Sequence, residues 1–146
     1  MILLDTNVIS EFMLAVPDAR VTRWLDRQPR SSIWTTSINL YEIRAGLLTM
    51  PVDRRRAGLE SHFERILQVA IQDRILHYDA ESAERAAKLS AARRSERRPV
   101  ESRDMMIAGI VLASHAKLAT RNVKHFEEIA PSVVNPWAPA VRPDAH

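Results

Sequence analysis

Short apolar segments alternate with longer amphipathic segments along most of this chain of 146 residues. This alternation predicts strands that are each followed by a helix, and therefore a parallel sheet with helices on both faces. The strands are expected at residues 1–4, 31–36, 75–78, 118–120 and 133–134. The helices are expected at residues 6–14, 20–27, 37–48, 56–72 and 80–94, then from residue 102, with a further helical turn at 125–129.

Two of the expected helices carry specific signals. Ser37 is a good N-cap for the helix that follows the second strand. The helix that begins at Ser102 is apolar on every side over residues 105–113, and such a helix is buried between other elements. The helical period predicts that one stripe of the helix after Ser37 is formed by Ile38, Tyr41, Ala45 and Leu48.

Composition excludes several classes of protein. The chain has no cysteine, which rules out disulfides, zinc–thiolate sites and thiol nucleophiles. No apolar stretch approaches the roughly 18 residues that span a membrane, and the first residues lack the basic region of a signal peptide. We therefore expect a cytoplasmic protein without membrane association. The net charge of +3 is small, but all except three of the 21 basic residues are arginine, which binds phosphate and carboxylate bidentately.

Three acidic residues stand in sequence that otherwise favours burial. Asp5 follows the first apolar run, Glu42 has apolar neighbours in the helix after the second strand, and Asp104 opens the apolar helix. The predicted topology brings all three to the carboxyl edge of the sheet, where parallel sheets form their sites. Converging carboxylates repel one another, and a hard divalent cation such as Mg²⁺ or Mn²⁺ balances them. Such a site activates water and holds a phosphodiester.

Each acid taken alone has a simpler explanation, as a helix cap or an ion-pair partner. A carboxylate in a first helical turn, such as Asp104, also favours the helix dipole. A phosphatase-like or receiver-like pocket likewise begins with an aspartate after a first strand. The phosphatase pattern needs a second aspartate where this chain has Asn7, and the receiver pattern needs paired acids where it has Leu4 and Asp5. The three acids together therefore favour the metal site.

Four segments in chain order resemble the motifs of PIN-domain proteins, and especially those of the VapC and FitB-like toxins. A single such motif is weak, but four in order at these separations form a strong signal. The resemblance covers almost the whole chain, residues 1–137. The segments are residues 2–11 (ILLDTNVISE), 36–46 (TSINLYEIRAG), 104–108 (DMMIA) and 118–126 (LATRNVKHF), and residues 134–137 (VNPW) resemble the closing strand.

This resemblance implies a fold and an activity. The fold is a three-layer α/β/α sandwich around a mainly parallel sheet of four to five short strands, with a PIN-like nuclease domain over residues 1–137 and a flexible tail over 138–146. The activity is that of an endoribonuclease that requires Mg²⁺ or Mn²⁺ and is the toxin of a bacterial toxin–antitoxin pair. Its partners are then an RNA substrate and a small antitoxin protein, through which the complex binds operator DNA, and the toxin forms a homodimer.

The resemblance also implies the site residues. Asp5, Glu42 and Asp104 match the catalytic, metal-binding acids, and Asn122 matches a fourth metal ligand. We expect Asp5 and Asp104 to be the principal ligands, since a strand and a buried helix fix them, while Glu42 and Asn122 tune the site. Polar residues around the pocket are expected to be Thr6, Asn7, Thr120 and Arg121.

Two residues depart from the family pattern. Asn122 offers a neutral oxygen where the family often has aspartate, and His125 replaces the aspartate that commonly precedes the phenylalanine. Both changes reduce the negative charge, so we expect one tightly held ion and a second only with substrate. The same changes leave open another interpretation, a catalytically weakened PIN-like regulator that binds an antitoxin or nucleic acid without cleaving it.

Overall fold

A five-stranded parallel sheet forms the centre of the computed structural model, which describes residues 1–139. The strands lie in the order β3-β2-β1-β4-β5, so the chain builds outward from β1 first to one side and later to the other. A ligand site in such a sheet is expected where the order reverses, beside the carboxyl end of β1. The strands are β1 (Ile2–Leu4), β2 (Ile33–Thr36), β3 (Ile75–Leu76), β4 (Lys117–Ala119) and β5 (Val133–Val134).

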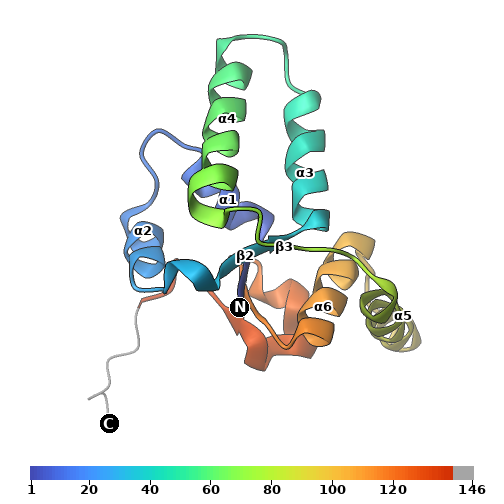
Figure 1. Cartoon of the computed structure of the whole chain (residues 1–146). Coiled ribbons are helices and arrows are strands. Elements are labelled where there is room, and N and C mark those ends of the chain that lie inside the picture. The colour runs from blue at the N-terminus through green and yellow to red at the C-terminus, as the bar shows by residue number, and fades with distance from the viewer. Residues whose placement is uncertain (140–146) are drawn as a thin grey trace.

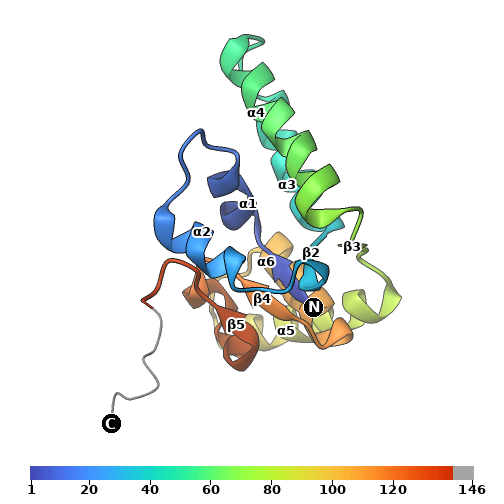
Figure 2. The same cartoon turned by 60° about the vertical axis from the view of Figure 1, so that its left-hand side comes forward.

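Helices cover both faces of this sheet, as the sequence predicts, and complete an α/β/α sandwich (Figure 1). Helices α3 and α4 form a hairpin that projects away from the sheet (Figure 2). The helices are α1 (Thr6–Phe12), α2 (Ala19–Asp26), α3 (Ser37–Leu48), α4 (Arg54–Arg65), α5 (Ala80–Ser95) and α6 (Ser102–Ser114). Shorter helical segments are η1 (Arg30–Ser32), the π-helical η2 (Ile66–Ile71) and η3 (Val123–Ser132).

The two faces of β1 enter different apolar clusters because successive side chains of a strand point to opposite sides. Leu4 packs with Val8 and Ile9 of α1 in a cluster that also receives α2, α3 and α4. Leu3 packs with the buried face of α6, including Ile107, in a second cluster that extends to η3. The sheet therefore separates two cores, and the first strand contributes to both.

Several local expectations are wrong in detail. The N-cap of α3 is Thr36, whose hydroxyl accepts a hydrogen bond from the backbone N–H of Asn39, and Ser37 is the first helical residue. The predicted stripe is also wrong, because the buried face of α3 consists of Asn39, Ile43 and Leu47. Tyr41 and Leu48, two of the predicted residues, are 61% and 67% exposed. The apolar pattern does not predict Asn39, because a buried polar side chain does not contribute to such a pattern.

Other boundaries shift by a few residues. Helix α4 begins at Arg54, with Asp53 as its N-cap, and its continuation to Ile71 is π-helical. The third strand pairs over two residues only, and β4 begins at Lys117. Among residues 1–139, no helix is long and apolar enough to cross a bilayer. The tail expected over residues 138–146 lies outside the described residues from position 140 onward.

Helices α5 and α6 pack closely at Gly109. A Cβ atom at this position would overlap the carbonyl oxygen of Ser82 and lie 2.9 Å from the Cβ of Ala86. The helix that the sequence predicts to be apolar all round is indeed buried, and glycine permits its close approach to α5.

We expect Gly109→Ala to lower the free energy of unfolding by about 1–3 kcal/mol, because the added methyl forces α5 and α6 apart. Gly58→Ala is the matched control, since a Cβ there meets nothing within 4 Å and the exchange lies inside α4. The control should raise the free energy of unfolding by about 0.5–1 kcal/mol. Urea denaturation of the three proteins measures both effects, and equal stability of Gly109→Ala and the wild type would contradict this packing.

Candidate active site

An open pocket of about 500 Å³ lies at the carboxyl edge of the sheet, beside the end of β1. Asp5, Glu42 and Asp104 all line it, although 37 and 62 residues separate them along the chain. Asp5 follows β1, Glu42 lies in α3, and Asp104 lies in the first turn of α6. The fold therefore brings the three acids into one pocket. The other lining residues are Thr6, Asn7, Ser10, Glu11, Leu14 and Asn122.

Asp5 is the buried acid of this pocket, with 5% of its surface exposed. Its Oδ1 accepts hydrogen bonds from the Thr6 backbone N–H at 2.8 Å and from Asn39 Nδ2 at 2.9 Å. Its Oδ2 accepts one from the Thr120 hydroxyl at 2.7 Å. A carboxylate has about four acceptor positions, so these three bonds leave one, on Oδ2. Asp5 is thus held rigidly and keeps one lone pair for a ligand.

Glu42 and Asp104 are less enclosed, with side chains that are 21% and 18% exposed. Glu42 Oε1 accepts a hydrogen bond from the Thr6 hydroxyl at 3.1 Å, and its Oε2 lies 3.9 Å from a guanidinium nitrogen of Arg103. Asp104 Oδ2 lies 3.1 Å from Nδ1 of His125. Each acid therefore has one oxygen in contact with a neighbour that restrains it.

Burial raises the pKa values of all three acids, and repulsion by neighbouring carboxylates adds to it for Glu42 and Asp104. For Asp5, burial raises the pKa, against the hydrogen bonds from Thr120, Thr6 and Asn39. For Glu42, burial raises the pKa most, and the charges of Asp5 and Asp104 raise it further. Burial is also the main cause for Asp104, where the nearby His125 opposes it. Carboxyl groups that are costly to ionise together are typical of functional sites.

A hydrogen-bonded network centred on Thr120 joins the end of β4 to α1. The Thr120 hydroxyl donates to Asp5 and accepts from Asn7 Nδ2 at 3.2 Å and from the Asn122 backbone N–H at 3.1 Å. Asn7 Oδ1 in turn accepts from the Arg121 backbone N–H at 3.1 Å. Only the backbone of Arg121 takes part, since its guanidinium lies over the ring of Trp137, 5.0 Å from the ring centre. The network fixes both the acid and the loop that carries Asn122.

A buried ion pair holds the segment that carries His125. Arg93 of α5 forms a bidentate pair with Glu128, at 2.7 and 2.8 Å, and donates a further hydrogen bond to the carbonyl of His125 at 2.7 Å. This contact lowers the pKa of Glu128 to about 2. Helix α5 therefore anchors η3, the segment that carries His125.

Two residues of the site were not predicted. Asn39 is fully buried and donates to both Asp5 and Thr6, the latter at 3.1 Å. It stands one helical turn before Glu42, which is the signal that sequence reasoning could have used, since residues three apart share a helix face. Arg103 adjoins Asp104 in the sequence and reaches Glu42 instead, a pairing that depends on the tertiary fold.

The oxygen ligands in the pocket fit a hard divalent cation such as Mg²⁺. Within residues 1–139, no three histidine, aspartate or glutamate side chains are placed to hold one ion together. Magnesium keeps several water ligands and binds proteins through one or two carboxylates, so it does not require such a group. The free lone pair of Asp5 and the open oxygens of Glu42 and Asp104 provide ligands of this kind, with the amide oxygen of Asn122 nearby.

A model of the PIN domain family matches residues 2–130. The chain belongs to the PIN domain family. It is 39% identical to the plasmid stability protein StbB of Pseudomonas syringae pv. tomato, over 94% of this chain and 99% of StbB. It is 34% identical to the VapC ribonuclease Y4jK of Sinorhizobium fredii, over 96% of this chain and all of that protein.

Solved structures of related toxin–antitoxin complexes have the same fold as this PIN domain. A chain of FitAB bound to an IR36 DNA fragment superposes with a TM-score of 0.85 and 28% identity, covering 97% of this chain and 99% of that one. A chain of FitAcB from Neisseria gonorrhoeae gives a TM-score of 0.79 and 29% identity, covering 94% and 99%. The predicted resemblance to VapC and FitB-like toxins and the predicted fold class are both confirmed.

The raised pKa values predict that Asp104→Asn stabilises the PIN domain at neutral pH when EDTA removes divalent ions. A carboxyl whose pKa is raised on folding contributes stability below its ordinary pKa, here 3.8, and loses it as the pH rises through the raised value. Asparagine does not ionise, so the variant does not lose stability in this way as the pH rises. The free energy of unfolding of the variant minus that of the wild type should therefore increase as the pH rises from about 4.

Urea denaturation at a series of pH values measures this difference directly. Asparagine keeps the size of the side chain and an acceptor for His125, so the comparison isolates the charge. A difference that stays constant or decreases with rising pH would contradict a raised pKa of Asp104.

Proposed function

We propose that this PIN domain is the toxin of a toxin–antitoxin pair and cleaves RNA with the help of Mg²⁺ or Mn²⁺. The observation that carries the proposal is the convergence of three acids with raised pKa values in one open pocket. The relatives support the substrate, since one of them is named a VapC ribonuclease and another is the toxin FitB. Solved structures with the same fold come from toxin–antitoxin complexes, which supports the toxin role.

The reaction is the hydrolysis of a phosphodiester, in which a water oxygen bonds to phosphorus and one phosphorus–oxygen bond of the backbone breaks. A divalent ion, when bound, lowers the pKa of water and neutralises the charge that develops on phosphate. Asp5 and Asp104 would hold this ion, because a strand end and a buried helix fix them in place. Asn122 would supply a neutral oxygen at the edge of the site.

Glu42 is suited to accept the proton that the attacking water loses. Its carboxylate is half-buried and its pKa is raised, which brings it nearer to the pH at which a general base works well. The Thr6 hydroxyl restrains Oε1 and leaves Oε2 toward Arg103. The guanidinium of Arg103 lies on this side of the pocket, where it can stabilise the negative charge that develops on the phosphate during the reaction.

The antitoxin is expected to block the same pocket with a basic side chain. Three clustered carboxylates attract a guanidinium as well as a metal ion. The related FitAB structure is bound to a DNA fragment, so binding of operator DNA through the antitoxin is part of this proposal. A homodimer is proposed as well.

The competing proposal is a regulator that has lost cleavage. The neutral Asn122 favours it, as does the exposed position of His125, 57% exposed, in place of an acid. The two proposals differ in one measurable property, which is the cleavage of RNA in the presence of a divalent ion.

We expect the purified protein to cleave structured RNAs with Mg²⁺ or Mn²⁺ and to be inactive in EDTA. Asp5→Asn and Asp104→Asn should abolish cleavage at every ion concentration, while Glu42→Gln should lower it with partial rescue by excess Mn²⁺. Asn122→Asp should keep activity or shift the optimum to lower Mg²⁺, since a carboxylate attracts the ion more strongly than an amide. The measurement is an ion titration of RNA cleavage.

An exposed acid on α5 provides the control. Glu84→Gln on α5 removes one carboxylate outside the pocket and should leave the titration unchanged. Cleavage that persists in EDTA, or near-normal rates in Asp104→Asn, would disprove the placement of the ion. Failure to cleave any RNA would favour the regulator.

A further inference from the structure

Three arginines form a basic row along α2 and its C-cap residue, Arg27. Arg20, Arg23 and Arg27 are exposed and recur at helical spacing, so they share one face over about 10 Å of the helix. They line an open groove of about 410 Å³ whose other wall is the segment after β5, including Pro136 and Pro139. This groove is separate from the acidic pocket, and none of the roles assigned above uses it.

The positive charge of the groove is only partly neutralised. Arg20 forms a close pair with Asp18, with a 2.8 Å contact between Nη2 and Oδ2, and this contact lowers the pKa of Asp18 to about 2. Within residues 1–139, Arg23 and Arg27 have no carboxylate within 4.0 Å. Asp26, the other acid of α2, lines a separate depression with Gln28. The groove therefore offers two guanidiniums to an anion.

A continuous set of contacts joins this groove to the acidic pocket. Trp137 follows Pro136 of the groove wall and lies beneath the guanidinium of Arg121. Stacking occupies the face of a guanidinium and leaves the N–H donors in its plane available. The backbone N–H of Arg121 donates a hydrogen bond to Oδ1 of Asn7, which lines the pocket. A second connection runs through Glu11, which lines the pocket and accepts a 2.8 Å hydrogen bond from the backbone N–H of Asp18.

We propose that this groove, defined by Arg20, Arg23, Arg27 and the segment Pro136 to Pro139 together with Arg121, binds the phosphate backbone of a single RNA strand beside the acidic pocket. The inference rests on the proposed function and deepens it. A pocket of three carboxylates repels a polyanion, so a nuclease of this kind needs positive charge on the path to the pocket. Arginine suits this role because it binds phosphate bidentately.

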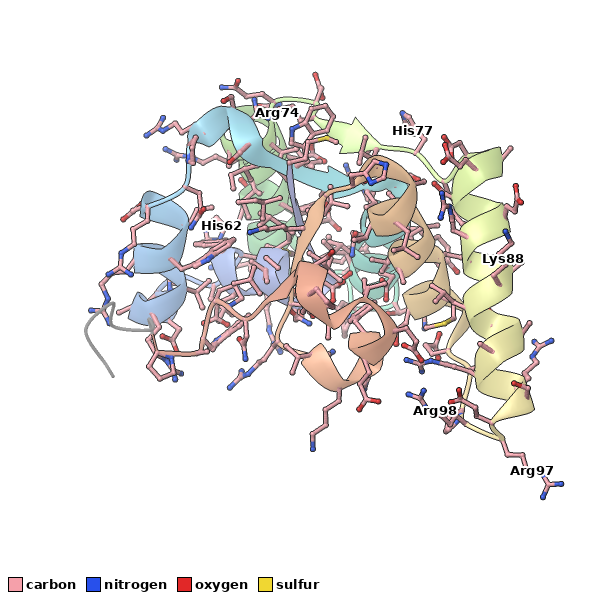
Figure 3. All side chains as sticks on the ribbon, turned by 90° about the horizontal axis from the view of Figure 1, so that it is seen from below. His62, Arg74, His77, Lys88, Arg97 and Arg98 are labelled. Atoms are coloured by element: carbon pink, nitrogen blue, oxygen red, sulfur yellow. The ribbon has the colours of Figure 1, made fainter. Side chains whose placement is uncertain are left out.

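The opposite side of the molecule carries the control residues. Figure 3 shows Lys88 of α5 across the molecule from α2. Arg85 and Arg94 of the same helix are exposed. The double variant Arg85→Gln/Arg94→Gln therefore removes as much charge as Arg23→Gln/Arg27→Gln, but away from the groove.

The test is the binding of a fluorescent single-stranded RNA in EDTA, followed by anisotropy at several salt concentrations. Each lost phosphate contact lowers the slope of log K against log salt by about 0.7, so the groove variant should bind more weakly with a slope smaller by about 1.4. The α5 variant should keep the wild-type slope, and circular dichroism checks that both variants fold.

The outcomes separate this inference from the proposed function because binding is measured without cleavage. A reduced slope supports the groove even if the protein cleaves no RNA. Equal slopes for the wild type and the groove variant overturn the inference, even if cleavage is normal. A groove variant that loses binding to a poly-glutamate peptide but not to RNA also overturns it, since the groove would then serve an acidic protein.

Discussion

The buried carboxylate of Asp5 is the group around which the rest of the site is arranged. A charged group at the end of a central strand is costly to bury unless hydrogen bonds compensate for the lost water. Three donors do so, and they come from the start of α1, from α3 and from the end of β4. The strand order makes this possible, because β1 lies between β2 and β4. Loss of this acid would therefore leave unpaired donors in three elements.

Repulsion among the acids is retained in the fold although it reduces stability. Burial and the neighbouring carboxylates raise the pKa values of Glu42 and Asp104. Among residues 1–139, Arg103 and His125 are the basic residues whose nitrogens lie within 4.0 Å of these two carboxylates. A ligand that brings positive charge is then bound partly because it relieves repulsion. The same physical cause would favour both the proposed metal ion and the proposed basic side chain of an antitoxin.

The sequence was sufficient to predict the parallel sheet, its five strands and the convergence of the three acids. Strand–helix alternation and the position of Asp5 directly after an apolar run determine these features. The buried face of α3 was not predictable in this way, because it includes Asn39 and excludes Tyr41. Contacts such as Arg93 with Glu128 join residues 35 apart, and only the packing of α5 against η3 brings them together. Local pattern therefore predicts where the site forms, while tertiary contacts determine how its residues are held.

The most direct test of the account is calorimetric titration of the purified protein with Mn²⁺ at neutral pH. We predict that the wild type binds the ion and that Asp104→Asn does not. Glu101→Gln, which removes an exposed acid just before the same helix, should still bind. Equal affinity of the wild type and Asp104→Asn for Mn²⁺, or no binding by the wild type, would contradict the claim that the acidic pocket binds a divalent ion through Asp104.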